Sequence, residues 1–343
     1  MMNSYLFLSF WQSLIEYKDI FLWPILASLL VGVLAPLIGS VIVIKRLSFI
    51  ADTLSHFSLA GITFGVLLAR ILSETIFSGV SPVIMGIIFS VSGTFLIEKL
   101  RGFYKNYKEL SMPIVMSFGA ALTGIFIALS HGSSSSMTNS LLFGSLFSVK
   151  PFDLGIIIFM AIGIFIFIAI YYKKIIGLCF DETFARVSGI RVKALQLAIT
   201  VIIAIFISTT MQMFGVLLIS ALMIVPIAAS ILIGKSFKNT IVIAIVFSEI
   251  SIIFGIYFSY IFALPSGSII VILNIIILTF VMIIDNILKR QKKNKKNNNI
   301  ENENPLIKEN IVLETETSLT LSTKDIEVIN GNNNNNNINN DIK

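Results

Sequence analysis

An aspartate and a histidine, Asp52 and His56, stand four residues apart in an otherwise hydrophobic stretch, RLSFIADTLSHFSLAGITFGVLLAR, at residues 46–70. In a helix, residues four apart lie on one face. An ionisable side chain inside a membrane costs about 2.5–3.5 kcal/mol on insertion scales and usually faces a bundle interior or a water-filled path. Carboxylates and imidazoles both bind transition-metal ions. The pair is therefore a candidate metal site; the alternative is a buried, neutral, hydrogen-bonded couple that holds helices together.

The predicted helix around this pair has two different faces. Asp52 and His56 share a stripe that continues to Thr63. The opposite side carries Gly61 and Gly65, whose GxxxG spacing lets another helix approach closely. One face is therefore expected to pack, and the other to present the carboxylate and the imidazole.

Glu249 is a second ionisable residue within an apolar segment, FSEISIIFG. Its functional interpretation is a second polar residue lining a path, or a proton relay. The simpler interpretation, which we favour, is a carboxyl group that is protonated or hydrogen-bonded to Ser248 or Ser251.

Two other motifs predict less. The GKS at residues 234–236 resembles the end of a phosphate-binding loop, but Ala229 stands where the motif needs its first glycine, and the tripeptide ends a membrane helix. The chain therefore shows no ATPase site, and any ATP-driven transport requires another polypeptide. His131, in the uncharged stretch HGSSSSMTN, is interpreted as an ordinary loop histidine rather than a receiving site for substrate or partner.

The composition is that of an integral membrane protein. Hydrophobic residues make up 56% of the 343 residues and charged residues only 13%. The net charge of +6 does not indicate a nucleic-acid partner, because the basic residues cluster at the ends of apolar segments. The single cysteine, Cys179, excludes a disulfide framework within the chain and a multi-cysteine zinc site. With two histidines in all, one copy cannot build a histidine-rich metal cage.

The apolar segments predict an all-α, polytopic membrane protein with eight to nine transmembrane helices. A break near residues 209–214 divides a segment of double length, and residues 140–149 are too short to cross. Placing every basic loop on one side puts the C-terminus in the cytoplasm. The expected spans are at about 24–44, 46–72, 82–98, 111–130, 152–172, 194–234 (two helices), 240–262 and 268–286.

Three regions follow from this pattern. Residues 1–20 are expected to form an interfacial segment, with a short span as the alternative, and no removable signal peptide is seen. Residues 21–288 are expected to form the transmembrane domain. Residues 289–343 begin with a polybasic run that can contact membrane lipid, and the asparagine-rich remainder is expected to be a disordered cytoplasmic tail.

RLSFIADTLSH, followed by FSLAGITFG, resembles the signature of the zinc/manganese/iron permease family of ABC importers, approximately R-x-S-x-x-G-D-A-L-S-H. Further stretches agree in the same order: LLFGSLFSV, CFDETFARVSGI, QMFGVLLISALMIVPIAAS and FSYIFALPSGSIIV. The match runs from about residue 24 to about residue 286. Ala51 and Thr53 stand where glycine and alanine are usual, and neither departure removes a ligand.

The resemblance implies a homodimeric permease in the cell (inner) membrane that is not itself an enzyme. It also implies cytoplasmic ATPase subunits and an external metal-binding protein that delivers the ion. By the same resemblance Asp52 and His56 coordinate metal in the central path, where two copies supply two carboxylates and two imidazoles. No cofactor is expected to be bound permanently. Zinc, manganese or iron is the cargo, and nitrogen and oxygen ligands suit all three.

Residues 180–193 correspond, by this resemblance, to the cytoplasmic loop that docks on the ATPase. A short amphipathic helix suits that task, because its apolar side chains can fill a groove while its charged ones make polar contacts. Gly189 is expected to end the helix. An interfacial helix lying on lipid is the alternative. The expected coupling residues are Phe180, Asp181, Glu182, Phe184, Ala185, Arg186 and Gly189.

We therefore expect the membrane-spanning permease subunit of an ATP-driven importer of divalent transition-metal ions. The alternative is a secondary metal transporter driven by an ion gradient. Such a transporter should carry more carboxylates within the membrane and need no docking loop.

Overall fold

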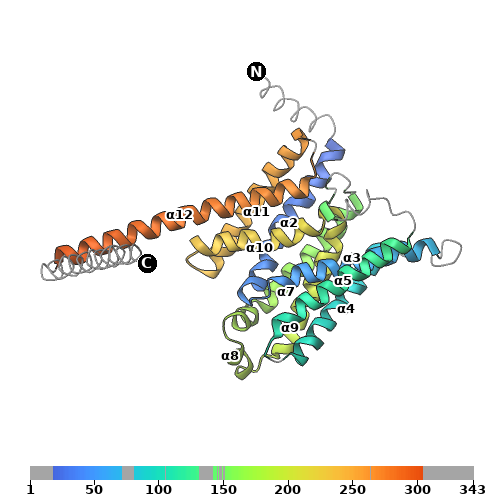
Figure 1. Ribbon diagram of the computed structural model, residues 1–343, viewed down its shortest axis with the longest axis horizontal. Helices are drawn as coiled ribbons and strands as arrows, with labels where there is room; N and C mark the ends of the chain where they lie inside the picture. The colour runs from blue at the N-terminus through green and yellow to red at the C-terminus, as the bar shows by residue number, and fades with distance from the viewer. Residues whose placement is uncertain are drawn as a thin grey trace, which may run out of the picture. The chain divides into compact units, whose positions relative to one another are not determined.

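The computed structural model describes residues 18–71, 81–104, 106–130, 142–144, 146, 149, 151–262 and 264–303. In these residues all regular structure is helical, and nine helices are long and apolar enough to cross a membrane. This finding confirms the predicted fold class and the predicted number of spans (Figure 1). The helices are α2 (Lys18–Ile44), α3 (Phe49–Ile71), α4 (Pro82–Phe103), the 3-10 turn η1 (Lys108–Leu110), α5 (Ser111–Leu129), α7 (Pro151–Phe180), α8 (Glu182–Val187), α9 (Val192–Phe214), α10 (Val216–Ile233), α11 (Phe237–Phe262) and α12 (Ser266–Glu303).

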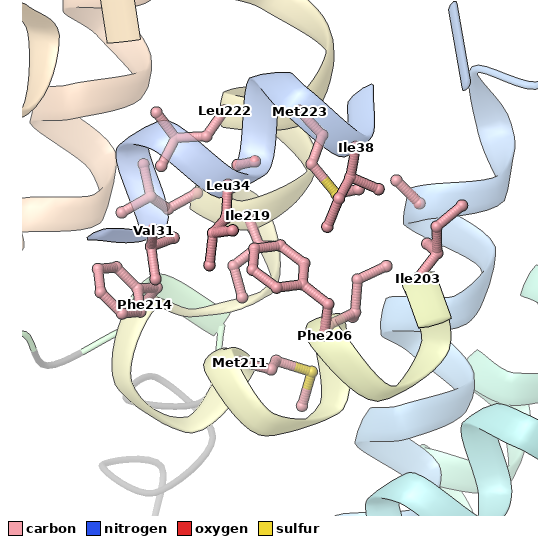
Figure 2. Close-up of a cluster of buried hydrophobic side chains, with 14 of the residues drawn as sticks. Val31, Leu34, Ile38, Ile203, Phe206, Met211, Phe214, Ile219, Leu222 and Met223 are labelled. Carbon is pink, nitrogen blue, oxygen red and sulfur yellow. The ribbon is translucent and has the colours of Figure 1, made fainter. Parts of the chain in front are cut away.

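Four helices form the centre of the bundle. In α2, α3, α9 and α10 at least 56% of the most apolar 18-residue stretch is buried, whereas in the other spanning helices at most 33% is buried. Figure 2 shows how side chains from α2, α9 and α10 meet in one apolar cluster. The cluster includes Val31, Leu34, Ile38, Phe206, Met211, Phe214, Ile219 and Leu222.

Two helices continue well beyond the predicted spans. The span expected at 152–172 belongs to α7, which continues through Lys173 and Lys174 to Phe180, and the span expected at 268–286 belongs to α12, which continues to Glu303. An apolar run measures only the part of a helix that suits hydrocarbon. Lysine and arginine are good helix formers, so the backbone can stay helical beyond that run.

The break between α9 and α10 lies at Gly215, just after the expected region. Its φ of 79° is in the left-handed region that glycine adopts without strain. The described part of residues 140–149 packs here, because a Cβ on Gly144 would meet the backbone of Phe214 and Gly215. Leu146 is buried in the core. This short segment therefore supports the break and, where described, does not span.

The chain divides into two compact units, Met1–Met282 and Ile283–Lys343. In the second unit the ammonium of Lys289 lies 2.7 Å from a carboxylate oxygen of Asp285, one helical turn away. Most of the expected interfacial segment 1–20, His131 and residues 304–343 lie outside the described residues. The predictions made for them stay predictions.

Candidate functional site

Helix α3, which carries Asp52 and His56, lies between α4 and α5. A Cβ on Gly61 would come within 2.6 Å of the Phe89 Cβ of α4. A Cβ on Gly119 of α5 would come within 3.1 Å of the Phe57 backbone nitrogen. Both neighbours thus approach α3 closely at a glycine, and the predicted packing face around Gly61 is present.

Asp52 and His56 are the exceptions on this buried helix. From Ile50 to Thr63 every other residue is buried, whereas these two side chains are half-buried. They interact electrostatically, yet within the described residues neither is tied down by a hydrogen bond or an ion pair. The carboxylate and the imidazole therefore lie one turn apart and are available to bind a ligand. They do not form a hydrogen-bonded couple. Farther along the predicted stripe, Thr63 is buried, so only the first part of the stripe is accessible.

Hydrogen bonds near both ends fix how α3 sits against its neighbours. The Thr53 hydroxyl lies 2.7 Å from the Phe49 carbonyl of its own helix and 3.1 Å from the Met112 carbonyl of α5. Near the opposite end the Arg70 guanidinium donates to the carbonyl of Ser130, the residue that follows α5. With α3 held in this way, the direction of the Asp52 and His56 side chains is set by the packing of the bundle.

One copy of the chain offers few metal ligands. Among the described residues no group of three or more histidine, cysteine, aspartate or glutamate side chains could hold a metal ion. Bound divalent metals usually take about four or more ligands. Asp52 and His56 can therefore contribute two ligands to a site, and other ligands must come from outside the described part of one copy.

Glu249 lies elsewhere, in α11, where its side chain contacts α2. Both carboxyl oxygens are buried and lack a hydrogen-bond partner in the described structure, as does the Ser248 hydroxyl. The Ser251 hydroxyl pairs instead with Asn274 Oδ1, at 3.0 Å. The serine-bonded interpretation of Glu249 is therefore wrong. A Cβ on Gly32 of α2 would lie 2.6 Å from Glu249 Oε1, so the carboxyl fills the space that this glycine leaves.

The segment expected to couple to an ATPase forms the helix α8, as predicted. Asp181 caps its start, with Oδ1 2.8 Å from the Thr183 backbone nitrogen and 3.0 Å from that of Phe184. Hydrogen bonds from the Thr183 hydroxyl and the Phe184 amide lower the pKa of Asp181. Gly189, with φ of 79°, ends the helix as expected. Two backbone bonds, Ile190 to Ala185 and Gly189 to Arg186, complete the cap.

One side of α8 is anchored and the other is free. Ala185 is buried in a small cluster with Leu178, Val192 and Leu195. Phe184 and Val187 remain 65% and 88% exposed, and Phe180, the last residue of α7, remains 68% exposed. The apolar side chains expected to fill a partner's groove are thus accessible.

The charged residues of α8 also have partners within the chain. The Glu182 carboxylate lies 3.2 Å from the guanidinium of Arg186 in the same helix. It also lies 3.9 Å from the ammonium of Lys45, which is in the turn between α2 and α3. Burial lowers the pKa of Lys45, while the Glu182 carboxylate acts in the opposite sense. No local spacing in the sequence connects Lys45 with α8. The sequence likewise holds no signal that pairs Gly32 with Glu249.

Spanning helices, a half-buried polar pair and an exposed capped helix define a polytopic membrane permease. The chain matches the ABC 3 transport family over residues 17–285 and belongs to that family. Its relatives are membrane subunits of transport systems, and the chain is not itself an enzyme.

The chain matches several curated relatives over most of their length. The chain is 31% identical to a "Probable metal transport system membrane protein" of Treponema pallidum, over 75% of this chain and 92% of the relative. It is also 31% identical to the "Manganese transport system membrane protein MntC" of Listeria monocytogenes, over 74% and 86%. A "Probable iron transport system membrane protein" of Haemophilus influenzae is 28% identical, over 73% and 88%.

A solved structure has the same fold. The chain matches "PsaBC from Streptococcus pneumoniae in complex with Fab" with a TM-score of 0.69 and 25% identity. The match covers 80% of this chain and 95% of that one.

Proposed function

We propose that the chain is the membrane-spanning permease subunit of an ATP-driven importer of divalent transition-metal ions, with manganese or iron as the cargo. Relatives named for manganese, iron and metal transport support the cargo class. Zinc has the same ligand chemistry, although none of these names includes it.

The observation that carries the proposal is the accessibility of Asp52 and His56 on a helix that is otherwise buried from Ile50 to Thr63. A carboxylate attracts a divalent cation, and a neutral imidazole adds a nitrogen ligand. An ion in transit must also leave, so a small set of ligands held briefly suits transport better than a closed cage.

Two copies related by a two-fold axis would complete the site. Each would supply one carboxylate and one imidazole, because a two-fold axis brings the same patch of both copies together. Four ligands are within the usual range for such ions. No resident cofactor is required; the ion is the substrate.

Two further partners are proposed, one on each side of the membrane. Cytoplasmic ATPase subunits would dock on α8, and ATP binding and hydrolysis there would shift the two copies between outward- and inward-facing states. An external metal-binding protein would deliver the ion on the other side. The chain would then lie in the inner membrane with its C-terminus in the cytoplasm, as the basic loops indicate.

Metal uptake by cells that carry Asp52→Asn or His56→Ala tests the site. Asparagine keeps the shape of aspartate but removes its charge, so both variants should abolish uptake while leaving membrane abundance and ATPase contacts intact. Asp285→Asn, which removes a carboxylate in the middle of α12, serves as the matched control and should transport normally. Normal uptake by Asp52→Asn at normal abundance would reject a charge-based metal site.

Reconstitution into vesicles tests the energy source. With the ATPase subunits present, metal flux should require ATP. Flux driven by a proton or sodium gradient through this chain alone would instead support a secondary transporter.

A further inference from the structure

A pocket of about 440 Å³ opens between α7 and α9 at the end of both helices that adjoins α8. Its charged lining consists of Lys174 of α7 and Arg191, the residue before α9, and no acidic side chain lines it. Phe167, Leu195 and Ala198 form an apolar wall. The pocket therefore combines two positive charges with an apolar surface.

The two cations are available to an external anion. Neither Lys174 nor Arg191 takes part in an ion pair within the described part of the chain. The Lys174 ammonium lies 5.2 Å from the centre of the Tyr171 ring, which also lines the pocket. A cation held over an aromatic face in this way stays beside the cavity.

A separate apolar groove of about 370 Å³ lies farther along the same two helices. Ile202 of α9 lies about one turn farther from α8 than Ala198, Ile166 of α7 lies one residue beyond Phe167, and the groove reaches Phe159. No charged residue lines it. At 1.5 Å per residue, the distance along α7 from Lys174 to Phe159 is about 22 Å. One leaflet's hydrocarbon layer is about 15 Å thick, so the pocket and the groove together are long enough for a headgroup and an acyl chain.

We propose that this pocket and groove form a binding site for one anionic phospholipid. The headgroup phosphate lies between Lys174 and Arg191, and an acyl chain follows the groove from Ala198 toward Phe159. A zwitterionic headgroup suits the pocket less well, because its own ammonium would face two cations. Ser188 and Gly189, at the end of α8, also line the pocket, so a bound lipid touches the last turn of that helix. The site does not depend on the identity of the cargo.

Native mass spectrometry of the purified full chain tests the charged half of the site. Phosphatidylglycerol should be retained and phosphatidylcholine should not. The double variant Lys174→Gln/Arg191→Gln should lose about tenfold or more of the phosphatidylglycerol retention, since each basic residue near an anionic headgroup contributes about 1 kcal/mol. The matched control Lys235→Gln/Lys238→Gln, with Lys235 in the turn between α10 and α11 and Lys238 in the first turn of α11, removes the same charge and should lose less than about twofold. Equal losses in both variants would reduce the site to general surface attraction and overturn the proposal.

Ala198→Trp tests the apolar half without changing any charge. The indole would fill the wall beside the groove, so lipid retention should fall although both cations remain. Unchanged retention would overturn the acyl-chain placement. This variant also keeps the proposal testable if the charge variant does not fold, which its helix content by circular dichroism will show.

A competition experiment separates a lipid from a soluble phosphate. Excess inorganic phosphate should leave bound phosphatidylglycerol in place, because it cannot occupy the groove. Displacement by inorganic phosphate would identify a soluble-anion site and overturn the lipid assignment. If the charge variant instead keeps its lipid but loses ATPase co-purification, the pocket is a protein-docking surface, which also overturns it.

Discussion

The ammonium of Lys45, in the turn between α2 and α3, lies 3.9 Å from a carboxylate oxygen of Glu182 in α8. The Lys45 side chain is only 11% exposed, whereas that of Glu182 is 50% exposed. Helix α3 begins at Phe49, shortly after this turn, and carries Asp52 and His56. The contact is therefore a short physical connection between the candidate coupling helix and the candidate cargo ligands.

Replacing Lys45 with methionine tests whether the Lys45–Glu182 contact holds α8 in place without contributing to the stability of the fold. Burial lowers the Lys45 pKa below its usual 10.5 despite the opposing Glu182 charge. The charged form is thus less favoured in the folded than in the unfolded chain, and stability should rise as pH passes from the lowered folded value up to 10.5. Lys45→Met should abolish that alkaline rise and leave stability at neutral pH equal or higher, while hydrogen exchange in α8 becomes faster. Thermal unfolding against pH and exchange by mass spectrometry measure both.

The matched control for that variant is Lys289→Met, which removes an exposed lysine from an ion pair on α12. It should leave α8 exchange unchanged. A clear loss of stability at neutral pH in Lys45→Met would mean that the ion pair outweighs the burial of the charge.

Asp181 is expected to act first as the cap of α8. Asp181→Ala removes the acceptor for two backbone amides, so α8 should exchange faster and ATPase co-purification should fall. Asp181→Asn should retain most of both, because asparagine also caps helices well. The lowered pKa of Asp181 means that the cap is present at neutral pH and is lost only as pH falls through a value below 3.8. If Asn fails as badly as Ala, the charge itself contacts a partner.

Phe184 is expected to be the main apolar contact of α8 with the ATPase. Phe184→Asp places a charge in the partner's groove and should cost about 2–4 kcal/mol of association, by analogy with interface hot spots. Phe184→Leu, which keeps an apolar side chain, should bind nearly as well. Because Phe184 is 65% exposed, neither change should disturb membrane insertion. Undiminished ATPase recovery with the aspartate variant would remove this assignment.

The close contact of Glu249 with Gly32 can be measured as a coupling energy. Gly32→Ala would place a Cβ 2.6 Å from Glu249 Oε1 and should destabilise the protein by about 1–3 kcal/mol. Glu249→Ala should relieve part of that cost, although Ile252 lies equally near and limits the rescue. Additive effects in a double-mutant cycle would show that the two residues do not interact.

Local sequence patterns predicted the spanning helices and the Asp52/His56 pair, because hydrophobic length and helical spacing depend only on neighbouring residues. They also predicted α8 and its end at Gly189. They could not show that Asp52 and His56 are the accessible residues on a buried helix, since that depends on how α4 and α5 cover α3. The Lys45–Glu182 and Gly32–Glu249 contacts join residues far apart in the chain, so one sequence without an alignment carries no signal for them.

The thirty residues of α7 give it a length of about 45 Å, against about 30 Å for the hydrocarbon layer. Its final turns, which include Lys173 and Lys174, therefore exceed the length that the hydrocarbon layer needs, and α8 follows them after Asp181. Measured from the middle of the bilayer, a tilt change of about 10°, small within the range for membrane helices, moves the end of α7 by about 5 Å. A tilt change of this size in α7 would therefore displace α8 by nearly one helical turn.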